Sequence, residues 1–201
     1  KRINAKGEVR AQFHHVIDIA PTVLEAAELP EPKVVNGSPQ EPIQGVSMVY
    51  TFANAKATSR HYVQYFEILG NRAIYSDGWL AGTLHRAPWE PKPRVALLDD
   101  KWELYDTRND FSLVNNLAAK NPTKLKELQD LFLKEAVKNH VLPIDDRVFE
   151  RMIPAMAGRP DLMGSRTSLT VYAGMTGMSE HVFDNLKNKS HTITADVEIP
   201  Q

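Results

Sequence analysis

The residues near the start of the chain that are most able to do chemistry are His14, His15 and Asp18, within the stretch "QFHHVIDIAPTVLEAAEL". Imidazole nitrogens and carboxylates bind metal ions and transfer protons, so this cluster could be a metal site or a general base. On a helix, however, adjacent histidines point roughly 100 degrees apart and cannot both bind one ion. We therefore predict a structural role, in which Asp18 holds a cap or a backbone donor at the start of a helix.

Two other pairs of residues have oxygen atoms that could bind a cation. Asp99 and Asp100 follow the apolar run "RVALL", and strand ends often hold metal ligands. No parallel-sheet pattern surrounds them, so we interpret them as turn residues. Asp184 and Asn185 could bind calcium, but their Gly-, Asn- and Lys-rich surroundings favour a turn. The sequence therefore predicts no metal ligand and no catalytic residue in this chain.

The stretch "HRAPWEPKPR" places His85, Arg86 and Trp89 in a predicted loop. Arginine and tryptophan are common recognition residues, so this loop is a candidate rim for an anionic or aromatic substrate. The alternative interpretation is that the loop packs against a neighbouring domain.

The elements that must position these residues follow from local patterns. β-branched and aromatic runs, broken at Gly70-Asn71 and Asp77-Gly78, predict antiparallel strands near 62–69, 72–76 and 79–84, with a fourth strand in "KWELYDT". A helix is expected from Asn121-Pro122 to about Asn139. Its apolar stripe consists of Leu125, Leu128, Phe132 and Ala136. The predicted fold class is α+β, a four-stranded antiparallel sheet packed on one long helix.

The remaining segments have weaker patterns. A first helix is expected to start near Asp18 or Ala20 and to end before "LPEP". Residues 30–45 contain four prolines and are expected to form a long surface loop. Near the end of the chain, "SHTITADVEIP" alternates in the manner of a strand.

Composition excludes several classes of protein. The 201 residues include 24 basic and 25 acidic side chains, which give a net charge of -1, so no overall field favours nucleic acid or a membrane surface. The chain has no cysteine, which excludes disulfides, thiolate metal sites and a cysteine nucleophile. No apolar run approaches the roughly 20 residues that span a bilayer. Composition leaves the compartment open.

Four separated segments resemble, in order and spacing, the C-terminal part of type I sulfatases, most closely the bacterial arylsulfatases. They are "QFHHVIDIAPTVLEAAELPEP", "PIQGVSMVYTF", "QYFEILGNRAIYSDGWLAGTLHRAPWE" and "DKWELYDTRNDFSLVNNLAAKNPTKLKELQDLF". The resemblance implies a large α/β domain of the alkaline-phosphatase type, followed by a small domain with a four-stranded sheet and one long helix. It also implies hydrolysis of sulfate esters by a formylglycine made from the Cys or Ser of a C/S-x-P-x-R motif, with calcium held by aspartates and an asparagine.

None of these catalytic parts can be placed in this sequence, which lacks the motif. The resemblance therefore implies a portion that comprises the end of the α/β domain (1–57), the small sheet-and-helix domain (58–142) and an irregular extension with a truncated strand (143–201). We expect calcium and formylglycine only in the full-length parent, and we expect this chain alone to be inactive. Its expected partner is the N-terminal α/β domain of the same protein, and exposed apolar residues on the first helix could cause self-association. A self-contained α+β binding module is the competing hypothesis.

Overall fold

The computed structural model describes residues 7–93, 95–158, 163–176 and 188–199. The chain divides into two compact units, residues 1–145 and residues 146–201.

The centre of the first unit is an antiparallel sheet of four strands in the order β3-β4-β5-β6. The strands are β3 (Val63–Ile68), β4 (Asn71–Ser76), β5 (Trp79–Thr83) and β6 (Glu103–Asp106). Successive strands along the chain are neighbours in the sheet, because the first two connections are two-residue turns. The predicted four-stranded sheet is confirmed.

The two tight turns of the sheet place residues in the left-handed backbone region that such hairpins require. Asp77 and Gly78 have φ values of 44° and 84°, as the Asp-Gly pattern predicted. In the first hairpin the left-handed residues are Leu69 and Gly70, with φ values of 52° and 89°, whereas Asn71 already lies in β4. The turn is therefore one residue earlier than the predicted break at Gly70-Asn71.

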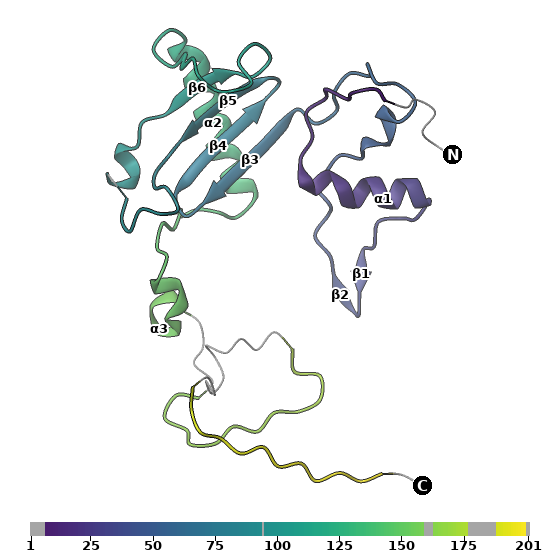
Figure 1. The fold of residues 1–201 in the computed structure, drawn as a ribbon, viewed down its shortest axis with the longest axis vertical. Helices are drawn as coiled ribbons and strands as arrows, with labels where there is room; N and C mark the ends of the chain where they lie inside the picture. The colour runs from purple at the N-terminus through teal and green to yellow at the C-terminus, as the bar shows by residue number, and fades with distance from the viewer. Residues whose placement is uncertain (1–6, 94, 159–162, 177–187, 200–201) are drawn as a thin grey trace. The chain divides into compact units, whose positions relative to one another are not determined.

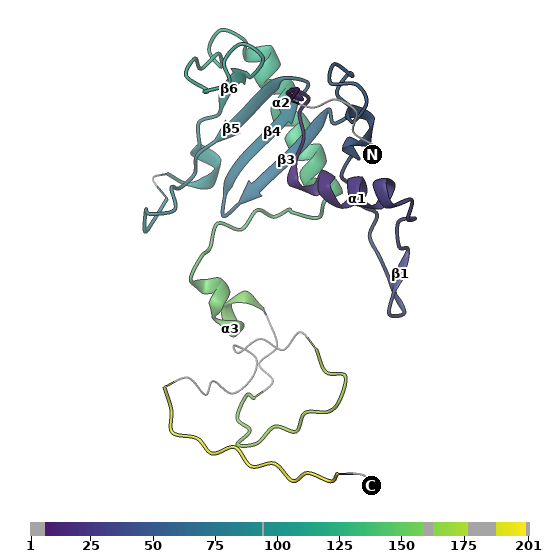
Figure 2. The same ribbon diagram turned by 45° about the vertical axis from the view of Figure 1, so that its right-hand side comes forward.

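Helix α2 (Pro122–Lys138) packs against one face of this sheet, as Figures 1 and 2 show. Asn121 precedes it and Pro122 occupies its first position, where a missing N–H costs no helical hydrogen bond. Leu128, Phe132 and Ala136 are buried against the sheet, and Leu125 is packed beside them. The opposing sheet residues are Ile74, Ala81 and Leu104, which are fully buried, and the partly buried Tyr65. The predicted α+β layer pair is thus confirmed, and it forms the core.

Before the sheet lie a short helix and an irregular segment. The 3-10 turn η1 (Val16–Asp18) leads directly into helix α1 (Ile19–Ala27). Asn36 and Gly37, both with positive φ, join the two-residue strands β1 (Val34–Val35) and β2 (Ser38–Pro39). The predicted loop over residues 30–45 therefore contains a small hairpin, because Asn-Gly readily adopts this turn. A further 3-10 turn, η2 (Met48–Thr51), follows.

The apolar residues of α1 are largely uncovered. Ile19 and Val23, like Val16 in η1, are each more than half exposed, and Leu24 is partly buried. Among described residues, no sheet packs against this side of α1.

The second unit contains η4 (Glu150–Met152) and the one-turn helix α3 (Pro154–Ala157). The sequence predicted a strand at residues 190–200, and the structure differs. Residues 190–199 lie outside any strand, and Ile193, Val197 and Ile199 are exposed. Alternation alone does not make a strand, because the backbone also needs a neighbour to complete its hydrogen bonds.

Candidate functional site

The carboxylate of Asp18 is fully buried and is the centre of a hydrogen-bonded cluster. One oxygen accepts bonds from the backbone N–H of His15 at 2.9 Å and from Nδ1 of His14 at 3.1 Å. The other accepts from the N–H of Val46 at 2.7 Å. Nδ1 of His61 lies 2.8 and 2.9 Å from the two oxygens. The prediction that Asp18 holds a backbone donor is confirmed.

These bonds set the protonation state of Asp18. Burial raises its pKa, but the bonds from the His15 and Val46 amides, together with those from His61 and His14, more than offset this effect. The net pKa lies below the ordinary value of 3.8, so the carboxylate is ionised at neutral pH. The cluster ties the start of α1 to the segment before β3.

The segment around residue 45 fits closely against α1. Thr22 donates to the carbonyl of Asp18 and accepts from the N–H of Met48 at 2.8 Å. A Cβ added at Gly45 would lie 2.1 Å from the carbonyl oxygen of Ile17, so a side chain cannot fit there. The Asp18 cluster therefore has a structural role, because it connects η1 and α1 to the segment that contains Val46 and His61. Its two histidines, His14 and His61, are oriented by one carboxylate.

A second buried carboxylate belongs to Asp100, whose side chain is 1% exposed. It accepts a hydrogen bond from Nη2 of Arg72, and Nδ1 of His85 lies 2.9 Å from its Oδ2. Arg72 also donates to the carbonyl of Leu97 at 2.9 Å. The residues before Asp100 form the 3-10 turn η3 (Leu97–Asp99), in agreement with the predicted turn at Asp99 and Asp100. Of these two carboxylates, that of Asp99 is exposed and that of Asp100 is buried. Asp100 thus fixes the start of β6 to β4 and to the loop after β5.

The predicted rim loop is held in place by Asn71. The Asn71 Oδ1 accepts from the N–H groups of His85 and Arg86 at 2.9 and 3.0 Å, and its Nδ2 donates to the carbonyl of Arg86. His85 is 1% exposed and faces Asp100, so it anchors the loop and does not form its outer surface. Arg86 is partly buried, whereas Trp89 is 83% exposed. Asn71 thus holds the backbone of His85 and Arg86, while Trp89 extends outward. A role of these three residues in substrate binding stays a prediction.

The sequence did not indicate that Asp18 contacts the distant His61 or that Asp100 contacts His85. His61 is 43 positions from Asp18 and His85 is 15 positions from Asp100, so no local spacing relates these pairs. Among described residues, no group of three or more His, Asp and Glu side chains could hold a metal ion. The predicted turn at Asp184 and Asn185 lies outside the described residues.

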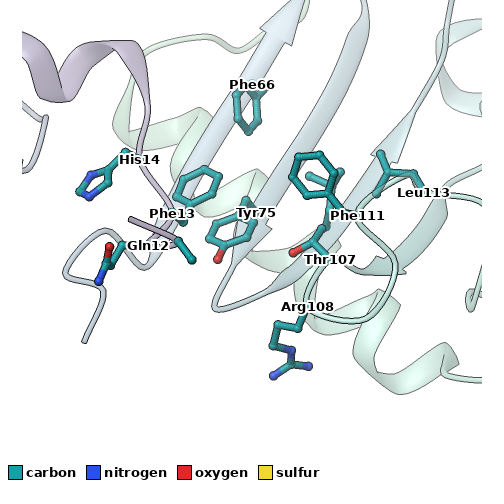
Figure 3. A pocket seen from close by; sticks show the side chains of 11 residues that line it. Gln12, Phe13, His14, Phe66, Tyr75, Thr107, Arg108, Phe111 and Leu113 are labelled. Atoms are coloured by element: carbon teal, nitrogen blue, oxygen red, sulfur yellow. The ribbon is translucent and has the colours of Figure 1, made fainter. Parts of the chain in front are cut away.

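An open pocket of about 540 Å³ lies over the sheet face opposite α2 (Figure 3). The ring of Phe13 stacks on Tyr75 with centroids 3.7 Å apart, and Phe66 lies beside them. Phe111 and Leu113, from the loop after β6, close the other side. The described lining contains no carboxylate, and its Arg108 is bonded to Asp106 at 2.7 Å. The lining is thus mainly aromatic and aliphatic, with Gln12, His14 and Thr107 as further polar members.

No family model matches the chain. The chain is 31% identical over 144 residues to an uncharacterized sulfatase from Schizosaccharomyces pombe. The match covers 70% of this chain but only 24% of that relative, so the chain spans about a quarter of the relative's length.

Solved structures give partial matches. A protein of Bacteroides thetaiotaomicron, described with the metabolism of multiple glycosaminoglycans, is 28% identical with a TM-score of 0.40, covering 61% of this chain and 24% of that chain. A protein solved with its substrate D-glucosamine-2-N,6-O-disulfate is 22% identical with a TM-score of 0.44, covering 65% and 25%. The similarity to a sulfatase is therefore taken from the sequence match to the Schizosaccharomyces pombe protein and not from these structures. In the described part of the chain, no helix is long and apolar enough to cross a membrane.

Proposed function

Because this chain resembles the C-terminal portion of a sulfatase, we propose that it is the non-catalytic end of a sulfuric ester hydrolase of the arylsulfatase type. The observation that carries the proposal is the 31% identity to a sulfatase over 144 residues. The match comprises 70% of this chain and only 24% of the relative, which leaves most of a parent protein to hold the chemistry.

The site residues support a scaffolding role. Both buried carboxylates are fully engaged in joining segments of the chain, Asp18 to His61 and Asp100 to Arg72. In catalysis, a sulfate ester needs a nucleophile and cations that offset the charge on its oxygens. The sequence has no cysteine and no serine within S-x-P-x-R. We therefore assign formylglycine, calcium and the sulfate ester to the parent, outside this chain.

The partner in this proposal is the α/β catalytic domain of the same protein. Ile19 and Val23 of α1, with Val16 of η1, make one side of this segment apolar and exposed, and exposed apolar surfaces often mark a contact with a partner. In the parent, this side would pack against the α/β sheet. In isolation, the same side would favour self-association.

The first test is to read the frame upstream of this chain. The proposal expects a C/S-x-P-x-R motif there, together with aspartate and asparagine residues suited to calcium. An upstream region without this motif would contradict it.

The second test is enzymatic. The purified parent is expected to hydrolyse a chromogenic aryl sulfate, and replacement of the motif Cys or Ser by Ala is expected to abolish turnover. The 201-residue chain, purified in the same way, is expected to show none. Turnover by the chain alone would overturn the assignment of the chemistry to the parent.

A further inference from the structure

Another cavity of the first unit, of about 690 Å³, is bordered by α1, the edge strand β3 and the end of α2. We call it the His61 cavity, after the most buried polar side chain in its lining. A hydrogen bond of 2.9 Å from the side chain of Gln44 to Oδ1 of Asn139 joins two of its walls, which are 95 positions apart in the sequence. Its volume lies in the range of ligand pockets in proteins.

The side chain of His61 is the main reason to expect a ligand in this cavity. It is 4% exposed, and its Nδ1 lies 2.8 and 2.9 Å from the two oxygens of Asp18. Because that carboxylate is ionised, Nδ1 carries the ring proton, and in the neutral ring Nε2 is an acceptor with a free lone pair. Among described residues, Nε2 has no hydrogen-bond partner, and it is not sealed by other atoms. Buried polar groups are nearly always hydrogen-bonded, so this nitrogen calls for a donor from a molecule in the cavity.

The other polar side chains of the His61 cavity also favour a ligand that brings donors. The side-chain N–H groups of Gln44 and Gln64 are used in bonds of 2.9 and 2.7 Å within the protein, and among described residues no group donates to the Oε1 atom of either one. The carboxylate of Glu135 accepts from Nζ of Lys138 at 3.4 Å, so the two charges compensate each other. The ligand is therefore expected to be rich in donors and neutral.

The remaining walls are aliphatic. Ile17, Ala20, Ile43 and Val63 line the cavity beside these polar groups. Hydroxyl groups carried on a compact carbon frame satisfy both kinds of wall, since the hydroxyls donate to the acceptors and the C–H groups pack against the aliphatic side chains.

The His61 cavity is separate from the exposed apolar side of α1. Ile17 and Ala20, which line the cavity, each follow by one position a residue of that apolar side, Val16 and Ile19. Successive residues of a helix point roughly 100 degrees apart, so the cavity and the apolar side are different surfaces of one segment.

We infer that the His61 cavity is a binding site for a neutral sugar unit. One sugar hydroxyl donates to Nε2 of His61, and further hydroxyls donate to Oε1 of Gln44 and of Gln64. Asp18 is a positioning residue, because its carboxylate fixes the ring proton on Nδ1 and so keeps Nε2 as the acceptor. This inference goes beyond the proposed function and does not depend on it.

A matched pair of substitutions tests the cavity. Ala20 is exposed and lines it, whereas Ala27 is exposed at the other end of α1 and is not part of its described lining. Ala20→Phe places a ring in the cavity, and Ala27→Phe makes the same change elsewhere on the helix. Neither residue belongs to the buried core, so both variants are expected to fold, and circular dichroism verifies this.

The measurement is the shift of the His61 imidazole signals in nuclear magnetic resonance spectra of the 201-residue chain. The probes are glucose and N-acetylglucosamine, together with cellobiose and chitobiose, the disaccharides built from these units. At least one probe is expected to move the signals saturably, with a dissociation constant of about 1–10 mM. Tighter binding of a disaccharide would identify the occupant as a unit of a longer glycan, and equal binding would identify it as a free sugar.

Ala20→Phe is expected to weaken this binding by at least about 10-fold and Ala27→Phe by less than about 2-fold. If Ala20→Phe does not fold, Gln44→Leu takes its place, because it removes one acceptor at an exposed position and is expected to weaken binding by at least about 3-fold.

Three results would overturn the inference. The first is that none of the four sugars moves the His61 signals. The second is that the sugars bind the blocked variant as tightly as the wild type, which would place their site elsewhere. The third is that sodium sulfate or methylammonium moves the signals and the sugars do not, which would assign the cavity to an anion or an amine. Each of them leaves the proposed function intact, since that function is tested by the upstream motif and by aryl sulfate turnover.

Discussion

At the scale of single residues, Asp18 has the largest expected effect on stability. It is fully buried and accepts bonds from two backbone amides and two histidines. Removing one partner from a buried charged network leaves the other groups unsatisfied. Asp18→Asn is therefore expected to lower the free energy of unfolding by about 3 kcal/mol at neutral pH.

The pH dependence of this loss is a sharper test. A carboxylate whose pKa is lower in the folded state stabilises the fold above its ordinary pKa and loses this contribution as pH falls through the lowered value. The difference between wild type and Asp18→Asn should thus be constant near neutral pH and shrink below the ordinary value of 3.8. Urea denaturation at several pH values measures it, with Asp99→Asn on an exposed carboxylate as the control. A difference that does not change with pH would contradict this prediction.

Tyr65 is the residue at which a substitution is expected to stabilise the protein. Its hydroxyl is buried and has no hydrogen-bond partner among the described residues. Burial, and secondarily the charge of Glu67, raises its pKa to about 12. Tyr65→Phe removes the unsatisfied group and keeps the ring that stacks on Phe132 at 4.9 Å.

The expected gain in the free energy of unfolding is about 1 kcal/mol. Tyr105→Phe is the control, since the Tyr105 hydroxyl donates to Glu103 at 2.8 Å and its removal should give no gain. Thermal denaturation of both variants measures the effect. A loss of stability in Tyr65→Phe would reveal a partner for the hydroxyl.

At the scale of elements, the contact between α2 and the sheet holds the first unit together. Phe132 is 2% exposed and contacts both Tyr65 and Trp102. Its neighbour Leu133 is 51% exposed on the same helix. Phe132→Ala is expected to cost about 3–5 kcal/mol, because it removes buried apolar surface and leaves a cavity.

Leu133→Ala changes helix propensity in the same direction but removes little buried surface, so it should cost under about 1 kcal/mol. Denaturant unfolding curves of the two variants give both values. Because Ala favours a helix more than Phe or Leu does, a loss in either variant reports lost packing, and equal losses would contradict the different burial of Phe132 and Leu133.

At the scale of the whole chain, the buried apolar cluster formed by the described residues lies in the first unit. Every residue of the buried cluster, and every residue packed against it, lies between Tyr65 and Ile144. A chain that ends at Asp145 should therefore unfold cooperatively, with a midpoint within about 2 °C of the 201-residue chain. A chain that ends at Lys120 lacks α2 and should show no cooperative transition. Loss of cooperativity in the chain that ends at Asp145 would mean that residues 146–201 contribute to the core.

Local sequence determined the sheet and the long helix. The turn at Asp77-Gly78 follows from backbone conformations that few other residue pairs adopt. The helix over 122–138 follows from Pro122 at its start and from one apolar stripe. These signals are contained within a few residues, so the fold class could be predicted without knowledge of distant contacts.

Tertiary structure alone decided which polar residues meet. Asp18 and His61 are brought together only when the segment around Gly45 closes against η1, and Asp100 reaches Arg72 only when the sheet forms. Likewise, alternation in residues 190–199 indicated a strand, but a strand requires a hydrogen-bonding neighbour that pattern cannot supply. The sequence by itself determined the elements of the small domain, because these depend on local backbone and side-chain preferences. The contacts that connect these elements depend on long-range hydrogen bonds between buried polar side chains, which only the folded chain establishes.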